Sequence, residues 1–184
     1  MNSDLFLAVR RDWQIFPLLH SSRLATAQPL LLHATSIETE IERWENRYPD
    51  CAWAVATGSE SGIFALAFSL DVGSASLRLF GERDPDLSRT LQVRGPNELL
   101  AFLEWPAVGL SPWTPSMIAP GVRLREEGNH VPIPGPGMTI HRYYEYVDRE
   151  APALPPSEWL MDLLHADNNG RGASRMFACR PSGL

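Results

Sequence analysis

HATSIETEIERWENRYPDCAWAVATGSESGIFALAFSLDVG, residues 33–73, contains the patterns that decide the fold. Its first half predicts an amphipathic helix, because apolar side chains recur at helical spacing at Ile37, Ile41 and Trp44. Thr35 and Glu38 fit a capping box, in which each side chain satisfies a free amide at the start of a helix. Pro49 then ends the helix, since proline cannot continue one.

The second half of this stretch predicts two apolar strands. CAWAVATG (51–58) closes on a glycine, SESG (59–62) turns the chain, and IFALAFSL (63–70) runs back. Two apolar runs with a four-residue connection that contains glycine are typical of a β-hairpin. We therefore expect these two strands to pair with each other.

Shorter elements are expected on both sides of this stretch. A helix is predicted at 4–11 and another at 154–166, where Trp159, Leu160, Leu163 and Leu164 share one face. Strands are predicted at 13–19, 77–80, 90–93, twice in 121–134 around a turn near Gly128, and at 141–147. The run at 97–105 fits a strand or a helix, and a strand is expected in its middle. Mixed short strands with a few helices indicate an α+β fold, with a small mixed or antiparallel sheet flanked by helices.

Composition and length set further limits on the protein. With 184 residues and 44% hydrophobic content, the chain suits one domain, expected over residues 1–166. The loop at 20–29 and the glycine-rich tail at 167–184 are expected to be irregular, and the tail flexible. No apolar run is long enough for a membrane span and no signal peptide pattern begins the chain, so a cytoplasmic location is expected.

Charge and cysteine content argue against two classes of site. The net charge of −6 is unlike that of a strongly basic nucleic-acid-binding domain, so binding to DNA would need a local basic patch. Cys51 and Cys179 have no ligand spacing for zinc, and two reduced structural thiols are expected.

The order of the central motifs resembles the bifunctional primase-polymerase family, the prim-pol domains of plasmid and phage replication proteins. In that family an AT pair precedes a helix with a tryptophan, followed by YPDA, ATG, a turn ending in SG and an apolar strand. This chain is similar at 34–35, Trp44, 48–50, 56–58, 61–62 and Gly73.

Flanking segments extend the resemblance over roughly residues 10–165. WQIFPLL (13–19) resembles the first strand of the family, and QPL (28–30) stands where a basic residue and PL usually follow. PGVRLREEGNHVPIPGPG (120–137) is similar to a later family segment, and Tyr144-Glu145-Tyr146 to its Y-x-W. The resemblance implies a core related to the RNA-recognition fold, with template-directed nucleotidyl transfer by two divalent metal ions.

That reaction needs clustered carboxylates to hold its metal ions. The resemblance places two family acids five and seven residues after Gly62, where this chain has Ala67 and Ser69. It places a third acid at Arg123 and a family histidine near Glu98. The expected protein is therefore a degenerate member that has lost catalysis, holds no metal and binds no cofactor.

Three functions remain open at this point. An accessory replication domain would bind single-stranded DNA, primer-template DNA or nucleotide, with phosphate contacts from Arg94, Arg123, Arg125 and Arg142. An interaction module would bind another replication or defence protein, such as a separate helicase. A residual polymerase would hold Mg²⁺ or Mn²⁺ with Asp71 and Glu98 at a shifted site.

Overall fold

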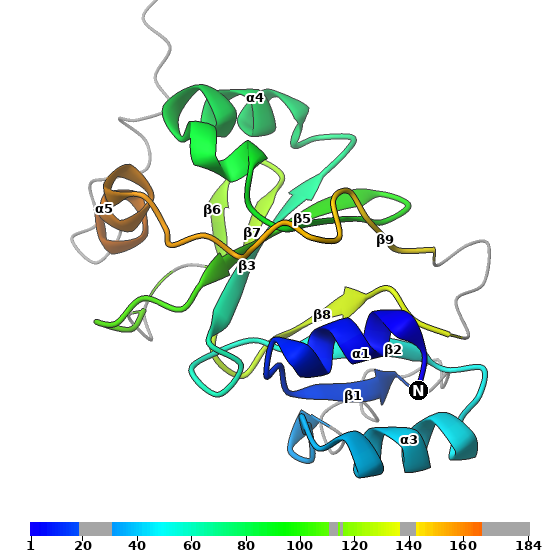
Figure 1. Ribbon diagram of the computed structural model, residues 1–184. Helices are drawn as coiled ribbons and strands as arrows, with labels where there is room; N and C mark the ends of the chain where they lie inside the picture. Colours follow the sequence, from blue (N-terminus) through cyan, green and yellow to red (C-terminus); the bar gives the residue numbers. More distant parts are fainter. Residues whose placement is uncertain (19–30, 111–113, 115, 137–142, 167–184) are drawn as a thin grey trace, which may run out of the picture.

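The computed structural model describes residues 1–18, 31–110, 114, 116–136 and 143–166. Figure 1 shows two groups of strands, each with its own helices. The helices are α1 (Ser3–Arg10), α3 (Glu38–Arg47), α4 (Ser74–Arg83), the 3-10 helix η2 (Pro85–Ser88) and α5 (Glu158–Ala166). The strands are β1 (Ile15–Leu18), β2 (Ala52–Ala56), β3 (Ile63–Ser69), β4 (Gln92–Arg94), β5 (Glu98–Glu104), β6 (Met117–Ala119), β7 (Val122–Arg125), β8 (His130–Ile133) and β9 (Glu145–Tyr146).

The strands form two antiparallel sheets, which confirms the α+β class. The three-stranded sheet has the order β1-β2-β8, and the six-stranded sheet has the order β6-β7-β3-β5-β4-β9. The chain passes from the first sheet to the second between β2 and β3, and returns between β7 and β8. These two passages lie side by side, since the Thr57 amide donates to the Asn129 carbonyl (3.0 Å) and the Thr57 hydroxyl donates to the Glu126 carbonyl (2.6 Å).

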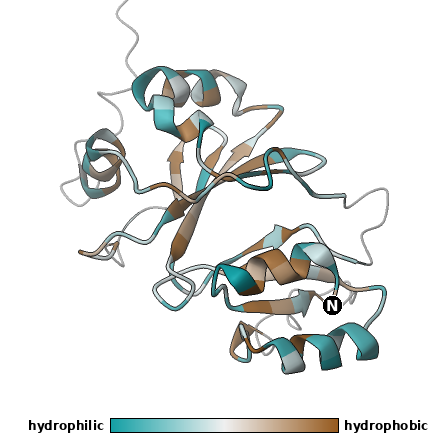
Figure 2. Ribbon diagram, viewed as in Figure 1, coloured by the Kyte–Doolittle hydropathy of each residue, from teal (hydrophilic) through white to brown (hydrophobic). Residues whose placement is uncertain are grey.

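One apolar cluster joins the two sheets to α1 and α3. It includes Trp13, Trp53 and Phe102, and the rings of Trp13 and Phe102 stack with centroids 5.2 Å apart. Figure 2 shows the same division, with brown apolar segments on the strands and teal polar segments on the outer sides of the helices. Burial of these large side chains holds the sheets in place.

A second cluster lies on the other face of the six-stranded sheet, under α4 and α5. Phe80 of α4 contacts Phe68 of β3 and Trp159 of α5 edge to face, with centroids 5.4 Å and 5.2 Å away. Figure 1 shows both helices on this side of the sheet. The alternation of β3 therefore divides its side chains between two cores.

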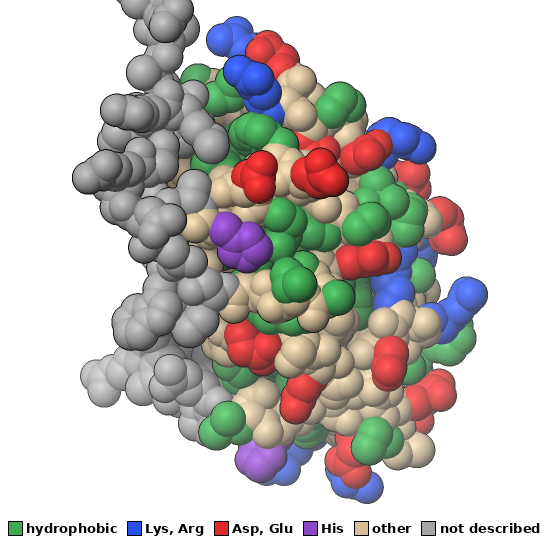
Figure 3. Space-filling view, turned by 90° about the vertical axis from the view of Figure 1, so that its left-hand side faces the viewer, with side chains coloured by type: hydrophobic (Ala, Val, Ile, Leu, Met, Phe, Trp, Pro, Cys, Tyr) green, Lys and Arg blue, Asp and Glu red, His purple; other side chains and the backbone are tan. Residues whose placement is uncertain are grey.

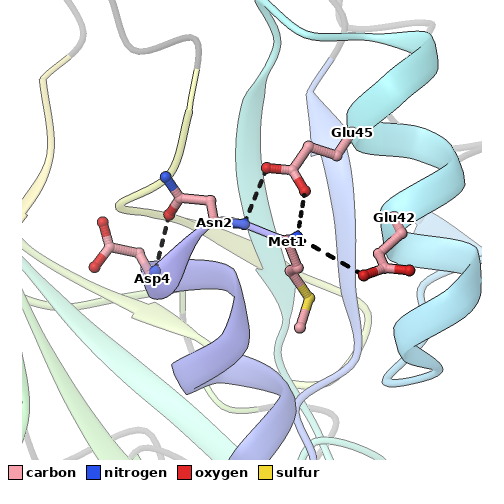
Figure 4. A network of polar contacts seen from close by, with 5 residues as sticks. All are labelled: Met1, Asn2, Asp4, Glu42 and Glu45. Carbon is pink, nitrogen blue, oxygen red and sulfur yellow. Dashed lines mark hydrogen bonds and ion pairs between the residues drawn. The ribbon is translucent and has the colours of Figure 1, made fainter.

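Polar contacts tie the beginning of α1 to α3 (Figure 4). Asn2 caps α1, since its side-chain oxygen accepts from the amide of Asp4 at 2.8 Å. The amide of Asn2 donates to Glu45 Oε1 at 3.0 Å, and the Met1 nitrogen lies 3.7 Å from Glu42 and 3.6 Å from Glu45. The two helices are thus joined by backbone groups as well as by apolar packing.

The expected hairpin of 51–58 and 63–70 is wrong. β2 pairs with β1 and β8, whereas β3 pairs with β5 and β7 in the other sheet. Only one bridge, between Gly58 and Ile63, links the two segments. Gly58 (φ 133°) and Gly62 (φ 65°) adopt backbone angles that favour glycine, and these turn the chain out of the first sheet.

Two other local expectations are also wrong. Residues 77–80 were expected to form a strand because apolar and polar side chains alternate in LRLF, but they lie in helix α4. The buried residues of α4 are Ser76 and Phe80, which are four residues apart, as on one face of a helix. The capping box at Thr35 is not formed, since α3 starts at Glu38 and the Thr35 hydroxyl accepts instead from the Ile37 amide at 3.0 Å. Ile37 is 60% exposed, so the buried face of α3 is carried by Ile41.

The other predicted elements are confirmed within the described residues. The helices at 4–11 and 154–166 and the strands near 13–19, 90–93, 97–105 and 121–134 are present. Of 141–147, the described part contains only the short strand β9. The predicted loop at 20–29 and the tail at 167–184 lie outside the described residues.

Candidate functional site

A cavity of about 570 Å³ lies where the two sheets meet. One side comes from the six-stranded sheet and contains Ala67, Ser69, Glu98, Arg123 and Arg125. The other side comes from the three-stranded sheet and contains Leu18, Ala52 and Pro132. We refer to this cavity as the cleft.

The strand register brings the predicted site residues together on one face. Ala67 of β3 stands directly opposite Arg123 of β7, and Ser69 of β3 stands directly opposite Glu98 of β5. Side chains of directly paired residues share a face of the sheet. Four positions from three separate segments of the sequence therefore meet in the cleft.

Arg123 and Arg125 give the cleft its positive charge. Their side chains share a face because they are two residues apart on β7, and Arg123 is exposed while Arg125 is half-buried. Within the described part of the chain, neither guanidinium forms an ion pair with an acidic side chain. Both are therefore available to an anion.

Glu98 is held by a tyrosine that the sequence analysis did not place at the site. The Tyr144 hydroxyl donates to Glu98 Oε1 at 2.8 Å, and Tyr144 lines the cleft. Its ring packs so closely on Gly95 that a Cβ there would lie 2.4 Å from a ring carbon. The Y-x-W resemblance was the available signal for Tyr144, but it did not indicate a contact with Glu98.

Asp71 lies just beyond the end of β3 and is fully exposed. Its carboxylate accepts hydrogen bonds from the Ser69 hydroxyl and from the Val72 amide, the latter at 2.7 Å. These two hydrogen bonds, that from Ser69 first, lower the pKa of Asp71. Asp71 is not among the residues that line the cleft.

Two turns meet at the mouth of the cleft. Gly121, at φ 69°, packs against Gly73 so closely that an added Cβ would lie 2.6 Å from the Gly73 Cα. The Gly121 carbonyl accepts from the Ser69 amide at 2.8 Å. Beside this contact, the exposed side chains of Val72 and Met117 give the cleft an apolar rim.

The other two predicted phosphate contacts do not join this group. Arg94 stands opposite Leu99 on β5, and Leu99 belongs to the core beneath α4 and α5. Arg94 therefore lies on the face of the sheet away from Arg123. Arg142 lies outside the described residues.

The cleft residues do not fit the two metal ions that the family resemblance implies. The positions matched to acids hold a methyl group at Ala67, a hydroxyl at Ser69 and a guanidinium at Arg123, and this cation would repel a divalent metal ion. Glu98 is a carboxylate, but it accepts a hydrogen bond from the Tyr144 hydroxyl. In the described ranges, no three histidine, cysteine or acidic side chains gather in a group that could hold a metal ion.

His130 of β8 lies beside this positive charge. Its ring meets Phe16 edge to face with centroids 5.5 Å apart. Burial, and to a lesser degree the charge of Arg125, lower the pKa of His130 below its ordinary value of 6.5. The folded domain therefore holds this ring neutral at pH values where the unfolded chain already binds a proton.

The free energy of unfolding is expected to fall as the pH drops from about 7 through 6.5, since the unfolded chain is protonated first there. His130→Gln should flatten this part of the profile, because glutamine does not titrate. Urea denaturation between about pH 7.5 and 5.5 measures the slope. His33→Gln, which changes an exposed histidine, is the matched control, and equal slopes for both variants would contradict the assignment.

Comparison with known proteins gives the family. None of the curated proteins compared with this chain matches it. None of the helices in the described ranges is long and apolar enough to cross a membrane. The model of one family, the N-terminal domain of bifunctional DNA primase/polymerase, matches residues 5–159, which include both sheets and every residue named above in the cleft. The chain therefore belongs to the bifunctional DNA primase/polymerase family.

Proposed function

We propose that the domain binds the phosphates of DNA or of a nucleotide in the cleft and does not catalyse nucleotidyl transfer. Membership of the family gives a primase/polymerase-like role in DNA replication. The observation that carries the finer proposal is the pairing of Arg123 with Ala67, at a position that resemblance assigns to a metal-binding acid. By that resemblance, a guanidinium stands where the family chemistry needs a carboxylate.

The chemistry of this replacement favours phosphate. A guanidinium presents parallel N–H donors that match two phosphate oxygens, so it neutralises and orients the anion without a metal ion. Arg125 supplies a second guanidinium on the same face, and neither is occupied by an acid of the described residues. Nucleotide phosphates are thus expected to bind in the presence of a chelator.

The charge of the chain does not favour phosphate binding over a broad surface. The chain carries a net charge of −6, and the face in Figure 3 shows acidic side chains scattered among apolar ones rather than a broad field of basic side chains. A protein that contacts many phosphates shows a steep dependence of affinity on salt. With two guanidinium groups we expect a shallow dependence, with a slope of roughly −1.5 for single strands.

Arg123→Gln is expected to weaken binding of a fluorescent single-stranded oligonucleotide about tenfold, since it removes a charge-assisted contact. The salt slope should also fall by roughly 0.7. Fluorescence anisotropy between about 50 and 200 mM salt, with EDTA or with Mg²⁺, measures both quantities. Arg123→Lys should recover part of the affinity, because it restores the charge but not the planar donor pair.

Arg94→Gln is the matched control, since it removes the same charge from the opposite face of the sheet. Primer extension with dNTPs and Mg²⁺ or Mn²⁺ is run on the same samples. Extension that Asp71→Ala abolishes would show a relocated metal site and overturn the inactive assignment. If the chain does not bind the oligonucleotide even at low salt, the binding assignment is overturned and a protein partner is favoured.

A further inference from the structure

A second cavity, of about 330 Å³, lies next to the cleft. Tyr144 lines both cavities. Strand β8 and the residues after it also line both cavities: Pro132 lines the cleft, and Pro134 and Gly135 line the second cavity. The two cavities therefore follow one another along the line where the sheets meet.

Tyrosine side chains supply the binding groups of the second cavity. Tyr143 lines it and is 56% exposed, so its ring is available for stacking. Tyr146 also lines it, and its buried hydroxyl has no hydrogen-bond partner among the described residues. A buried polar group without a partner is uncommon in a folded protein and calls for an explanation.

The charges around the second cavity do not favour a phosphate. Arg149 lines it, but its guanidinium lies 3.4 Å from the Asp4 carboxylate and donates to the Ser3 carbonyl at 2.8 Å. Glu145 adds a second negative charge. The cavity therefore suits a neutral group, whereas the cleft suits an anion.

We propose that the second cavity binds an unpaired nucleobase whose neighbour along the strand places its phosphate on Arg123 and Arg125. The ligand is then single-stranded nucleic acid of at least two nucleotides rather than a free nucleotide. This inference rests on the proposed function of the cleft and adds a subsite to it. Stacking on an aromatic ring accepts any base, so the subsite is tolerant of sequence.

Tyr146 has a defined part in this subsite. Burial is the main cause that raises the pKa of its hydroxyl, so the group keeps its proton and acts as a donor. A carbonyl oxygen or ring nitrogen of a base supplies an acceptor that the described residues do not provide. Because the hydroxyl is buried, it reaches such an atom through a shift of the Tyr146 side chain as the base enters.

The experiment uses the full chain and isothermal calorimetry with thymidine 5′-monophosphate and its di-, tetra- and octanucleotides. In the wild-type chain, affinity should rise roughly tenfold from one to two nucleotides because the second base is stacked. Tyr143→Leu should remove most of this rise and leave the melting temperature unchanged. Tyr146→Phe should reduce dinucleotide affinity several-fold while the stability stays equal or increases, since phenylalanine lacks the unpaired hydroxyl.

Phe6→Leu is the matched control, because Phe6 is 46% exposed and lines neither cavity. The rise from one to two nucleotides should be unaffected in this variant. If binding depends on Arg123 but the mononucleotide binds as tightly as the dinucleotide, the subsite is refuted and the proposed function stands. If no oligonucleotide binds, or Arg123→Gln changes nothing, the proposed function itself fails.

Discussion

Gly121→Ala is expected to lower the free energy of unfolding by about 3 kcal/mol or more. The residue has φ 69°, which costs an alanine roughly 1–2 kcal/mol. In addition, the new Cβ would lie 2.6 Å from the Gly73 Cα, and backbone atoms at that distance have to move. Because the Gly121 carbonyl bonds Ser69 at the mouth of the cleft, oligonucleotide affinity should fall as well.

Gly128→Ala separates the two causes. Gly128 has a similar φ of 74°, but an added Cβ meets nothing within 4 Å. This control should cost only about 1–2 kcal/mol, the conformational part of the effect. Urea denaturation of both variants measures the difference, and equal losses would show that the contact with Gly73 carries no energy.

Phe80→Ala is expected to cost about 3–5 kcal/mol, because it empties the place of a fully buried ring. Phe80 contacts Phe68 in the sheet and Trp159 in α5, so its loss weakens the packing between these elements. Hydrogen exchange should accordingly show α5 losing more protection than β3. Chemical denaturation gives the total loss of stability.

Two variants serve as controls for this prediction. Phe80→Leu keeps most of the volume and should cost less than about 1.5 kcal/mol. Phe6→Ala removes an equally large ring from a partly exposed position, 46% exposed, and should cost far less than Phe80→Ala. If Phe6→Ala and Phe80→Ala were equally destabilising, Phe80 would not be an organising residue of this core.

The sequence predicted local structure better than strand pairing. Helix α5 follows from apolar periodicity and is confirmed, and the strand expected in the middle of 97–105, where the apolar run also fits a helix, is confirmed as β5. The partners of β2 and β3 were wrong, because a short glycine-containing connection looks the same whether it folds the chain back or passes it to another sheet. The choice depends on β8, which is distant in sequence and forms the edge beside β2.

At the candidate site, some of the expected residues lie together in the structure and others do not. The family resemblance, counted along the chain from Gly62, selected Ala67 and Ser69, and the register places Arg123 and Glu98 opposite them. Arg94 was grouped with Arg123 because both are basic, yet the alternation of β4 directs it to the other face. Tyr146 shares the Y-x-W resemblance with Tyr144, but that pattern does not indicate that its hydroxyl lacks a partner among the described residues, since this depends on how β9 packs.

The position of β8 also has a consequence for how the chain folds. The three-stranded sheet is completed by a strand that follows every strand of the other sheet except β9. Pairings between residues so distant in sequence slow the folding reaction, because a long loop has to close first. During synthesis, a chain that has emerged only as far as Arg125 contains both arginines of the cleft but lacks Pro132, part of the opposite wall. The cleft therefore forms late, after most of the domain has left the ribosome.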